Sequence, residues 1–343
     1  MISYLQTNPG IVPLYHPTTV LLVDDNEDFL RSLKLVLGPG FQCFSFQTAQ
    51  QAIDYVRDET QQSKDLLSDV DLAAADTFEH IRDPDERRLH FKFSRLPQVF
   101  ADEGRFGKSS VIVADHAMPG MTGVAMLEAM RDLPLRKLLL SGAADDQIVV
   151  QAFNSGLIDA FYPKHHPALH DALADHLLKL QFEYFRDLTS PFDLALASPD
   201  ARFLSAAGFA DTFRRFVSDY QIIEYCVLMD PPGVFGLDDA GNPAILLVVD
   251  ADFQQASFEI AQAELAPTGL LRCLLDGSVI AVFPTANGFY TREMEPHWRQ
   301  FIWPGRAIAD SGWRCTVIDE PEVIRRVCRS VTSYSAYRQR RLS

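Results

Sequence analysis

Short apolar segments alternate with segments of helical periodicity in the first half of the chain, and this alternation restricts the fold more than any other feature. The apolar segments are 19–23, 41–46, 111–115, 137–141 and 158–162; the helical ones are 27–37, 49–56, 124–131, 145–155 and 168–186. Strands that alternate with helices of this length form a parallel sheet covered by helices on both faces. We therefore predict a doubly wound, five-stranded parallel α/β domain.

The rest of the chain has a different pattern. Segment 57–108 is rich in charge and lacks a strand signal, but holds enough apolar residues for two helices broken near Asp83-Pro84. Beyond residue 200, three strand-like segments follow one another through turns at PPG and AGN, which favours antiparallel pairing. We expect an N-terminal extension (1–18), the parallel domain (19–186) with a helical insertion at about 57–108, a linker (187–200) and an α+β domain (201–343). In the last of these we expect one helix over 201–219 and a final helix from near Pro321.

Polar side chains stand at the expected carboxyl ends of four strands. Asp24 and Asp25 follow the first strand, Asp115 and Ser141 end two others, and Lys164 follows the last. A doubly wound sheet brings such residues to one edge, where this fold binds ligands. Carboxylates are hard oxygen ligands that suit Mg²⁺, and a hydroxyl and a Lys can bind phosphoryl oxygens. The set predicts a phosphoryl-transfer site in which a carboxylate is the nucleophile.

The segments LLVDDNEDF, IVADHAMPGMTG, LLLSGAAD and DAFYPK resemble, in this order, the signature segments of response-regulator receiver domains. The resemblance covers residues 19–186 and implies a flavodoxin-like fold. It implies that Asp115 accepts the phosphoryl group and that Asp24, Asp25, Asp115 and the Ala117 carbonyl hold Mg²⁺. It further implies that Ser141 and Lys164 bind the phosphoryl group and that Phe161 is the aromatic switch.

Two departures from the family pattern affect these expectations. The insertion at 57–108 enters the next strand at its amino end, away from the phosphoryl site, so we interpret it as a dimerisation or kinase-contact element, with a decorative hairpin as the alternative. Lys164 is followed by His165 where the family has proline, so we expect the loop after Lys164 to be built differently.

The second half has no diagnostic motif. No helix-turn-helix, GGDEF-type or EAL-type string occurs in it. Its order of elements is loosely similar to PAS-like modules, and the whole chain resembles the response regulator of α-hydroxyketone quorum-sensing systems, whose second half is similar to a nucleotide-binding fold. Two hypotheses for this half stay open: an interaction or ligand-binding module without catalysis, and a nucleotide-processing domain. In the second, Asp250 and Asp252 hold a metal, with Asp238 or Asp239 nearby.

Charge and hydropathy bear on partners and location. The net charge is −15 and both halves are acidic, which disfavours nucleic acid as a partner. Direct DNA binding is left as a third hypothesis, through basic residues near the end of the chain: Arg325, Arg326, Arg329, Arg338, Arg340 and Arg341. The first residues lack the pattern of a secretory signal, and no apolar run approaches the roughly 20 residues of a bilayer span. We expect a cytoplasmic protein that meets a histidine kinase or phosphotransfer protein, forms a homodimer when phosphorylated, and catalyses no reaction beyond its own phosphorylation.

Overall fold

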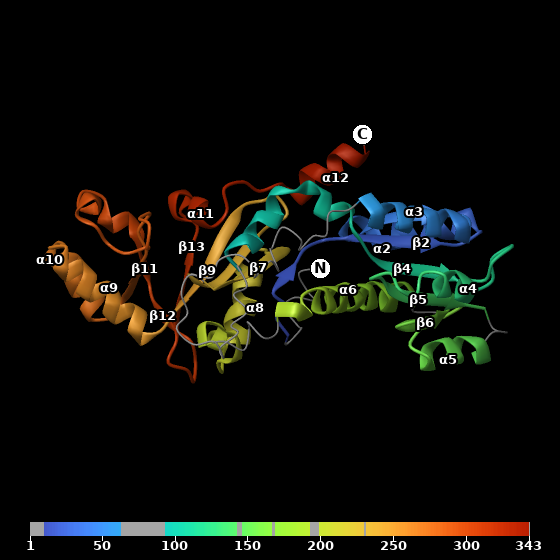
Figure 1. Cartoon of the computed structure of the whole chain (residues 1–343), viewed down its shortest axis with the longest axis horizontal. Helices are drawn as coiled ribbons and strands as arrows, with labels where there is room; N and C mark the ends of the chain where they lie inside the picture. Colours follow the sequence, from blue (N-terminus) through green and yellow to red (C-terminus); the bar gives the residue numbers. More distant parts are fainter. Residues whose placement is uncertain are drawn as a thin grey trace, which may run out of the picture.

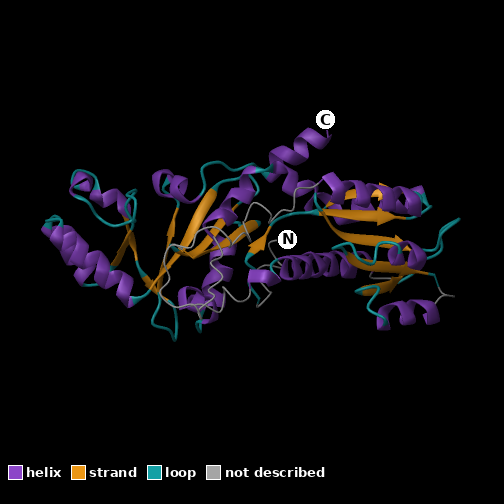
Figure 2. Ribbon diagram, in the orientation of Figure 1, coloured by secondary structure: helices purple, strands orange, loops and turns teal. Residues whose placement is uncertain are grey.

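The computed structural model describes residues 10–62, 93–142, 146–166, 169–192, 199–229 and 231–342. The expected helix break near Asp83-Pro84 lies outside these residues. Figures 1 and 2 show an elongated molecule, with the sheet of the first half toward one end and the sheets of the second half toward the other. Among the described residues, no helix combines the length and apolar character that a bilayer span requires.

Five parallel strands in the order β3-β2-β4-β5-β6 form the first sheet. They are β2 (Thr19–Val23), β3 (Gln42–Phe46), β4 (Ser109–Asp115), β5 (Arg136–Ser141) and β6 (Ala160–Pro163). The helices that follow these strands along the chain are α2 (Glu27–Leu37), α3 (Ala49–Gln62), α4 (Gly123–Glu128), α5 (Asp146–Asn154) and α6 (Leu169–Leu188). This is the predicted flavodoxin-like order, which confirms the fold expected for this half.

Alternation along the strands explains why helices cover both faces of this sheet. Successive side chains of a strand point to opposite faces. Leu21 and Val23 of β2 therefore join one core cluster, with α3, α4 and α5, whereas Val20 and Leu22 join another, with α2 and α6. The carboxyl ends of all five strands remain together at one edge.

The second half contains a six-stranded sheet in the order β1-β7-β8-β9-β13-β12 and a two-stranded sheet of β10 and β11. Its strands are β7 (Glu224–Met229), β8 (Pro232–Leu237), β9 (Pro243–Val249), β10 (Val279–Ala281), β11 (Ile302–Pro304), β12 (Arg306–Ala307) and β13 (Arg314–Ile318). Its α-helices are α8 (Phe209–Asp219), α9 (Ala251–Ala263), α10 (Thr268–Leu275), α11 (Pro321–Val327) and α12 (Tyr334–Leu342). All pairings within the larger sheet are antiparallel, as the turns between its strands predicted.

Two helix expectations for this half were wrong. Residues 201–219 do not form one helix: the 3₁₀-helix η5 (Pro199–Ser205) ends before Gly208, which has φ +77° and precedes α8. A Cβ on Gly208 would lie 2.8 Å from the Ala309 carbonyl oxygen, so close packing holds the break in place. The helix that begins at Pro321 ends at Val327 and is not the last one, because α12 follows it.

Segments from the first half complete the core of the second. β1 (Leu14–Tyr15) pairs with β7 at the edge of the six-stranded sheet. The 3₁₀-helix η2 (Phe93–Ala101), the described end of the insertion, adds Phe100, and the end of α6 adds Phe185; all are buried in one cluster with the second sheet. The domain boundaries expected from the sequence therefore stay a prediction. In the structure, segments of the first half are packed into the core of the second half.

The last helix packs back onto the first half. In α12, the Tyr337 hydroxyl accepts a hydrogen bond from the Gln42 side-chain amide (3.1 Å), and its ring lies 5.2 Å from that of Phe106. Phe106 belongs to the 3₁₀-helix η3 (Glu103–Gly107), which immediately precedes β4. In Figure 1, α12 lies on the side of the six-stranded sheet that is nearer to α3.

Candidate functional site

Asp24 and Asp25 follow β2 at the carboxyl edge of the parallel sheet. The Asp24 carboxylate is buried (1% exposed) and accepts a hydrogen bond from the Asn26 amide at 2.9 Å, whereas Asp25 is exposed. Asn26 caps α2 by accepting from the Phe29 amide at 3.0 Å. The sequence Asp-Asp-Asn thus ends the strand, begins the helix and directs one carboxylate inward.

Asp115 ends β4, the central strand of the sheet. It is buried (4% exposed) and lies beside Leu140 of β5. Carboxylate oxygens of Asp24, Asp25 and Asp115 all lie within 4.8 Å of one another, the only such group among the described residues with metal-ligand spacing. The structure therefore brings together the three carboxylates that the sequence singled out.

The loop after Asp115 is shaped by its two glycines. Gly120 has φ +80°, which a residue with a Cβ rarely adopts. A Cβ on Gly123 would stand 2.2 Å from the Asp115 carbonyl oxygen. Thr122 caps α4 by accepting from the Ala125 amide at 3.2 Å. The MPGMTG motif thus brings the start of α4 against the backbone of the expected phosphoacceptor.

Lys164 links two of the carboxylates. Its Nζ lies 2.7 Å from Asp24 Oδ2 and 2.8 Å from Asp115 Oδ2, and 4.9 Å from the centre of the Phe29 ring. Its amide donates to the Ser141 carbonyl at 2.9 Å, which continues the pairing of β6 with β5. This backbone pairing positions Lys164 although His165 follows it. Phe29 was missed in the sequence, where its helical spacing indicated only a core residue.

Burial and pairing shift the pKa values in this site. Burial raises the pKa of Asp24, with a smaller contribution from Asp115, while the hydrogen bonds from Lys164 and Asn26 oppose the rise. Burial alone would lower the pKa of Lys164, but its hydrogen bonds and attraction to Asp115 and Asp24 outweigh burial and raise it. Lys164 is therefore an ammonium ion that lies beside three carboxyl groups, so acidic groups outnumber basic ones in this cluster and favour an excess of negative charge. A divalent cation on hard oxygen ligands fits that charge.

Three further residues of the parallel domain were expected to belong to the site: Ser141, Ala117 and Phe161. Ser141 is buried (3% exposed) at the end of β5, next to Pro163 of β6. Ala117 is exposed in the loop after β4, and the metal contact expected of its carbonyl stays a prediction. Phe161 of β6 faces outward, 37% exposed, with its ring 5.9 Å from that of Phe153 in α5.

The carboxylates singled out in the second half have structural partners. Asp250 caps α9 by accepting from the Phe253 amide at 2.8 Å, and Asp252 is exposed in the first turn of that helix. Asp238 accepts from the Asn242 amide at 2.8 Å, and Asp239 pairs with Arg338 at 2.9 Å. Within the described residues, none of the four belongs to a group with metal-ligand spacing. Their role as metal ligands stays a prediction.

Several basic residues near the end of the chain also make internal contacts. Arg340 pairs with Glu103, and Arg326 donates to the carbonyl oxygens of Phe283 and Ala286, both at 2.9 Å. The Arg341 guanidinium lies 5.1 Å from the centre of the Phe44 ring. These contacts join α11 and α12 to neighbouring elements and give the basic residues a structural role.

Comparison with known proteins yields a structural match over nearly the whole chain. The response regulator LqsR of Legionella pneumophila is 23% identical, matches 96% of this chain and 95% of its own, and superposes with a TM-score of 0.71. The chain has the fold of LqsR. At this level of identity the likeness concerns the fold, which it supports through the second half as well as the first. The predicted resemblance to response regulators is confirmed at that level.

Shorter matches involve about half of the chain. A receiver domain protein of Clostridium thermocellum is 15% identical over 48% of this chain and 95% of its own, with a TM-score of 0.31. A receiver domain of Vibrio parahaemolyticus, from a putative LuxO repressor, is 14% identical over 53% of this chain and 99% of its own, with a TM-score of 0.33. No family model and no curated protein matches the chain.

Proposed function

We propose that this protein is a response regulator of a two-component phosphorelay, and that Asp115 accepts the phosphoryl group. The observation that carries the proposal is the position of Lys164 Nζ, 2.7 Å from Asp24 and 2.8 Å from Asp115. Burying the carboxyl groups of Asp24 and Asp115 side by side costs free energy, which the half-buried Lys164 offsets only in part, and a functional role would account for the arrangement. A site for an incoming phosphoryl group would use all three.

Mg²⁺ is the proposed cofactor. Asp24, Asp25 and Asp115 would hold it, together with the Ala117 carbonyl, and the ion would neutralise charge on the phosphoryl oxygens. The spacing of the three carboxyl groups, whose oxygen atoms lie within 4.8 Å of one another, supports this assignment. The exposed Asp25 leaves the site accessible from solvent.

The protein's own residues account for the remaining chemistry. A carboxylate oxygen of Asp115 attacks phosphorus, and the bond from phosphorus to the donor nitrogen or oxygen breaks as the new bond forms. Lys164 then balances charge on a phosphoryl oxygen, and the Ser141 hydroxyl donates to another. The donor would be the phosphohistidine of a histidine kinase or of a phosphotransfer protein.

Phosphorylation is proposed to control association of two copies of the chain. α5 and β6 together expose four large apolar side chains: Ile148, Val150, Phe153 and Phe161. Phe161, the expected switch aromatic, is one of them. Its rotation toward Ser141 would alter this surface and so change its fit to the same surface of a second copy. The second half then acts as an interaction or ligand-binding module, and catalysis by it stays an open alternative.

The decisive experiment adds Mg²⁺ and acetyl phosphate to the full chain and follows intact mass and size-exclusion elution. We expect a mass gain of one phosphoryl group that is absent in Asp115→Asn and retained in Asp132→Asn, which changes an exposed Asp on the loop before β5. We also expect earlier elution of the phosphorylated protein, reduced in Phe153→Ser. A wild-type protein that gains no mass, from acetyl phosphate or from a phosphorylated kinase, would refute the proposal.

A further inference from the structure

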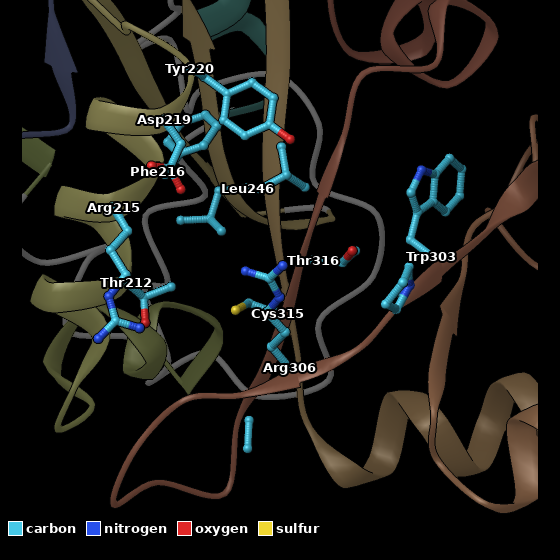
Figure 3. Close-up of a pocket in the computed structure, with 13 residues that line it drawn as sticks. Thr212, Arg215, Phe216, Asp219, Tyr220, Leu246, Trp303, Arg306, Cys315 and Thr316 are labelled. Carbon is cyan, nitrogen blue, oxygen red and sulfur yellow. The ribbon is translucent and has the colours of Figure 1, made fainter.

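A cleft opens on the six-stranded sheet, between α8 and the strands β11, β12 and β13 (Figure 3). Its volume is about 450 Å³, within the range of small-molecule sites. Leu246 and Thr316 of the sheet contribute to its lining. Arg215 comes from α8, Tyr220 directly follows that helix, and Trp303 and Arg306 come from β11 and β12. None of these residues belongs to the phosphoryl-transfer site.

Two guanidinium groups line this cleft without a carboxylate partner. Arg215 and Arg306 are exposed, and neither makes an ion pair with another described residue. Arginines elsewhere in this half differ: Arg214 pairs with Asp211, and Arg338 with Asp239. One carboxyl group, that of Asp219, also lines the cleft, so its two arginines outnumber its acidic groups on a chain whose net charge is −15. A phosphate or carboxylate group is the partner that the planar donors of a guanidinium group bind best.

The other lining groups favour a flat, partly apolar ligand. The indole of Trp303 is half-buried at one side, and Tyr220 is 38% exposed at another (Figure 3). Leu246 and Phe216 are buried and supply apolar contact area within the cleft. Stacking on an aromatic side chain stabilises a planar ring, and bases stack on such side chains with little dependence on their identity.

We propose that this cleft binds a small ligand made of an aromatic ring and a phosphate group, of the size of a nucleoside monophosphate. Arg215 and Arg306 would bind the phosphate, and Trp303 would pack against the ring. This site does not depend on Asp115, so the proposal stands or falls independently of phosphorylation. The proposed site is also separate from Asp250, which caps α9, and from Asp252, which lies in the first turn of that helix.

The test is a titration of the full-length protein by calorimetry, with Trp fluorescence as a second readout. The probes are AMP, GMP, CMP and UMP, with adenosine as the ring without phosphate and inorganic phosphate as the anion without ring. We expect at least one nucleotide to bind tenfold or more tightly than either fragment, and Asp115→Asn to bind it as the wild type does.

Four variants locate the site. Arg215→Gln and Arg306→Gln should each weaken nucleotide binding at least tenfold, Arg306→Lys should weaken it less, and Trp303→Leu should bring the affinity down toward that of inorganic phosphate. Arg272→Gln, which changes an exposed arginine on α10, is the matched control and should have no effect. Both cleft arginines are exposed, so their variants are expected to keep the fold, as far-UV circular dichroism would show. The proposal is overturned if no nucleotide binds better than phosphate, or if both arginine variants bind like the wild type.

Discussion

Arg105 donates hydrogen bonds to both carboxylate oxygens of Glu224, at 2.8 and 3.2 Å, and neither side chain is exposed to solvent. Arg105 lies in η3, immediately before the parallel sheet, and Glu224 begins β7 of the antiparallel sheet. The same guanidinium donates to the Phe100 carbonyl at 2.9 Å and to the Thr332 carbonyl at 2.9 Å. One buried side chain therefore joins the described end of the insertion to β7 of the antiparallel sheet and to the C-terminal segment.

Replacing Arg105 should destabilise the protein strongly. Arg105→Met leaves the Glu224 carboxylate buried without its cation, and loss of one partner of a buried pair costs about 3–5 kcal/mol. Urea denaturation followed by fluorescence would measure this. Arg105→Met with Glu224→Leu should recover part of the loss, because no unpaired charge remains. Arg340→Gln, which removes an exposed ion pair, is the control, expected to change stability by less than about 1 kcal/mol. If Arg105→Met lost no more stability than the control Arg340→Gln, the inferred role of Arg105 would be contradicted.

His16 should make the fold sensitive to acid. Its Nδ1 donates to the Pro17 carbonyl at 2.9 Å and its ring packs against Phe185. Burial lowers the pKa of His16 to about 3, and repulsion from Arg105 and Lys108 adds to this shift. The unfolded chain takes up a proton below about pH 6.5, where the folded protein does not. The contribution of neutral His16 to the free energy of unfolding is therefore complete above pH 6.5. It is lost as the pH falls toward 3, by up to about 1.4 kcal/mol per pH unit.

The measurement is the difference in unfolding free energy between wild type and His16→Phe at several pH values. The comparison with the variant is needed because Glu224 also titrates. Burial raises the pKa of Glu224 to about 7, so its titration increases stability as the pH falls from 7 to 4.5, opposite to the effect of His16. We expect the wild type to lose stability relative to the variant as the pH falls below 6.5. A difference that stays constant down to pH 4 would mean that His16 takes up its proton in the folded state.

Gly123→Ala should disturb the phosphoacceptor. The added methyl group would stand 2.2 Å from the Asp115 carbonyl oxygen, so the loop or the strand end must move. We expect a loss of about 1–3 kcal/mol in stability and a phosphorylation rate at least tenfold lower. Gly312→Ala is the matched control, because a Cβ there meets nothing within 4 Å. Phosphorylation of Gly123→Ala at the wild-type rate would show that the close approach is not needed.

Lys164→Met should separate metal binding from phosphoryl transfer. The ammonium group competes with a cation for Asp24 and Asp115, and two like charges about 4 Å apart repel by about 1 kcal/mol even in bulk water. Because Mg²⁺ carries two charges, we expect it to bind at least fivefold more tightly to the variant, while phosphorylation by acetyl phosphate slows. Calorimetry and intact mass would report the two effects. Weaker Mg²⁺ binding in Lys164→Met would mean that Lys164 mainly orients the carboxylates.

The parallel domain could be predicted from sequence because its inner strands β2, β4 and β5 are mostly buried apolar runs and the site residues lie at or just after strand ends. Asp24, Asp115 and Lys164 come together for that reason alone. Local pattern could not reveal β1, since Leu14 and Tyr15 form a strand only by pairing with β7. Arg105 has no local signal either, because its partners Glu224 and Thr332 are distant in sequence. The cleft was missed for the same reason: Arg215 and Arg306 meet only through the tertiary fold.

The pairing of β1 with β7 has a consequence for biosynthesis. The Val12 amide donates to the Tyr225 hydroxyl across 213 residues of chain. At about 5–20 residues per second, a ribosome needs roughly 10–40 seconds to make that interval. During this time β1 has no strand to pair with, although the strands of the parallel sheet are made before β7. β1 is thus synthesised early but reaches its native position late, and completion of the antiparallel sheet must wait for synthesis of the second half.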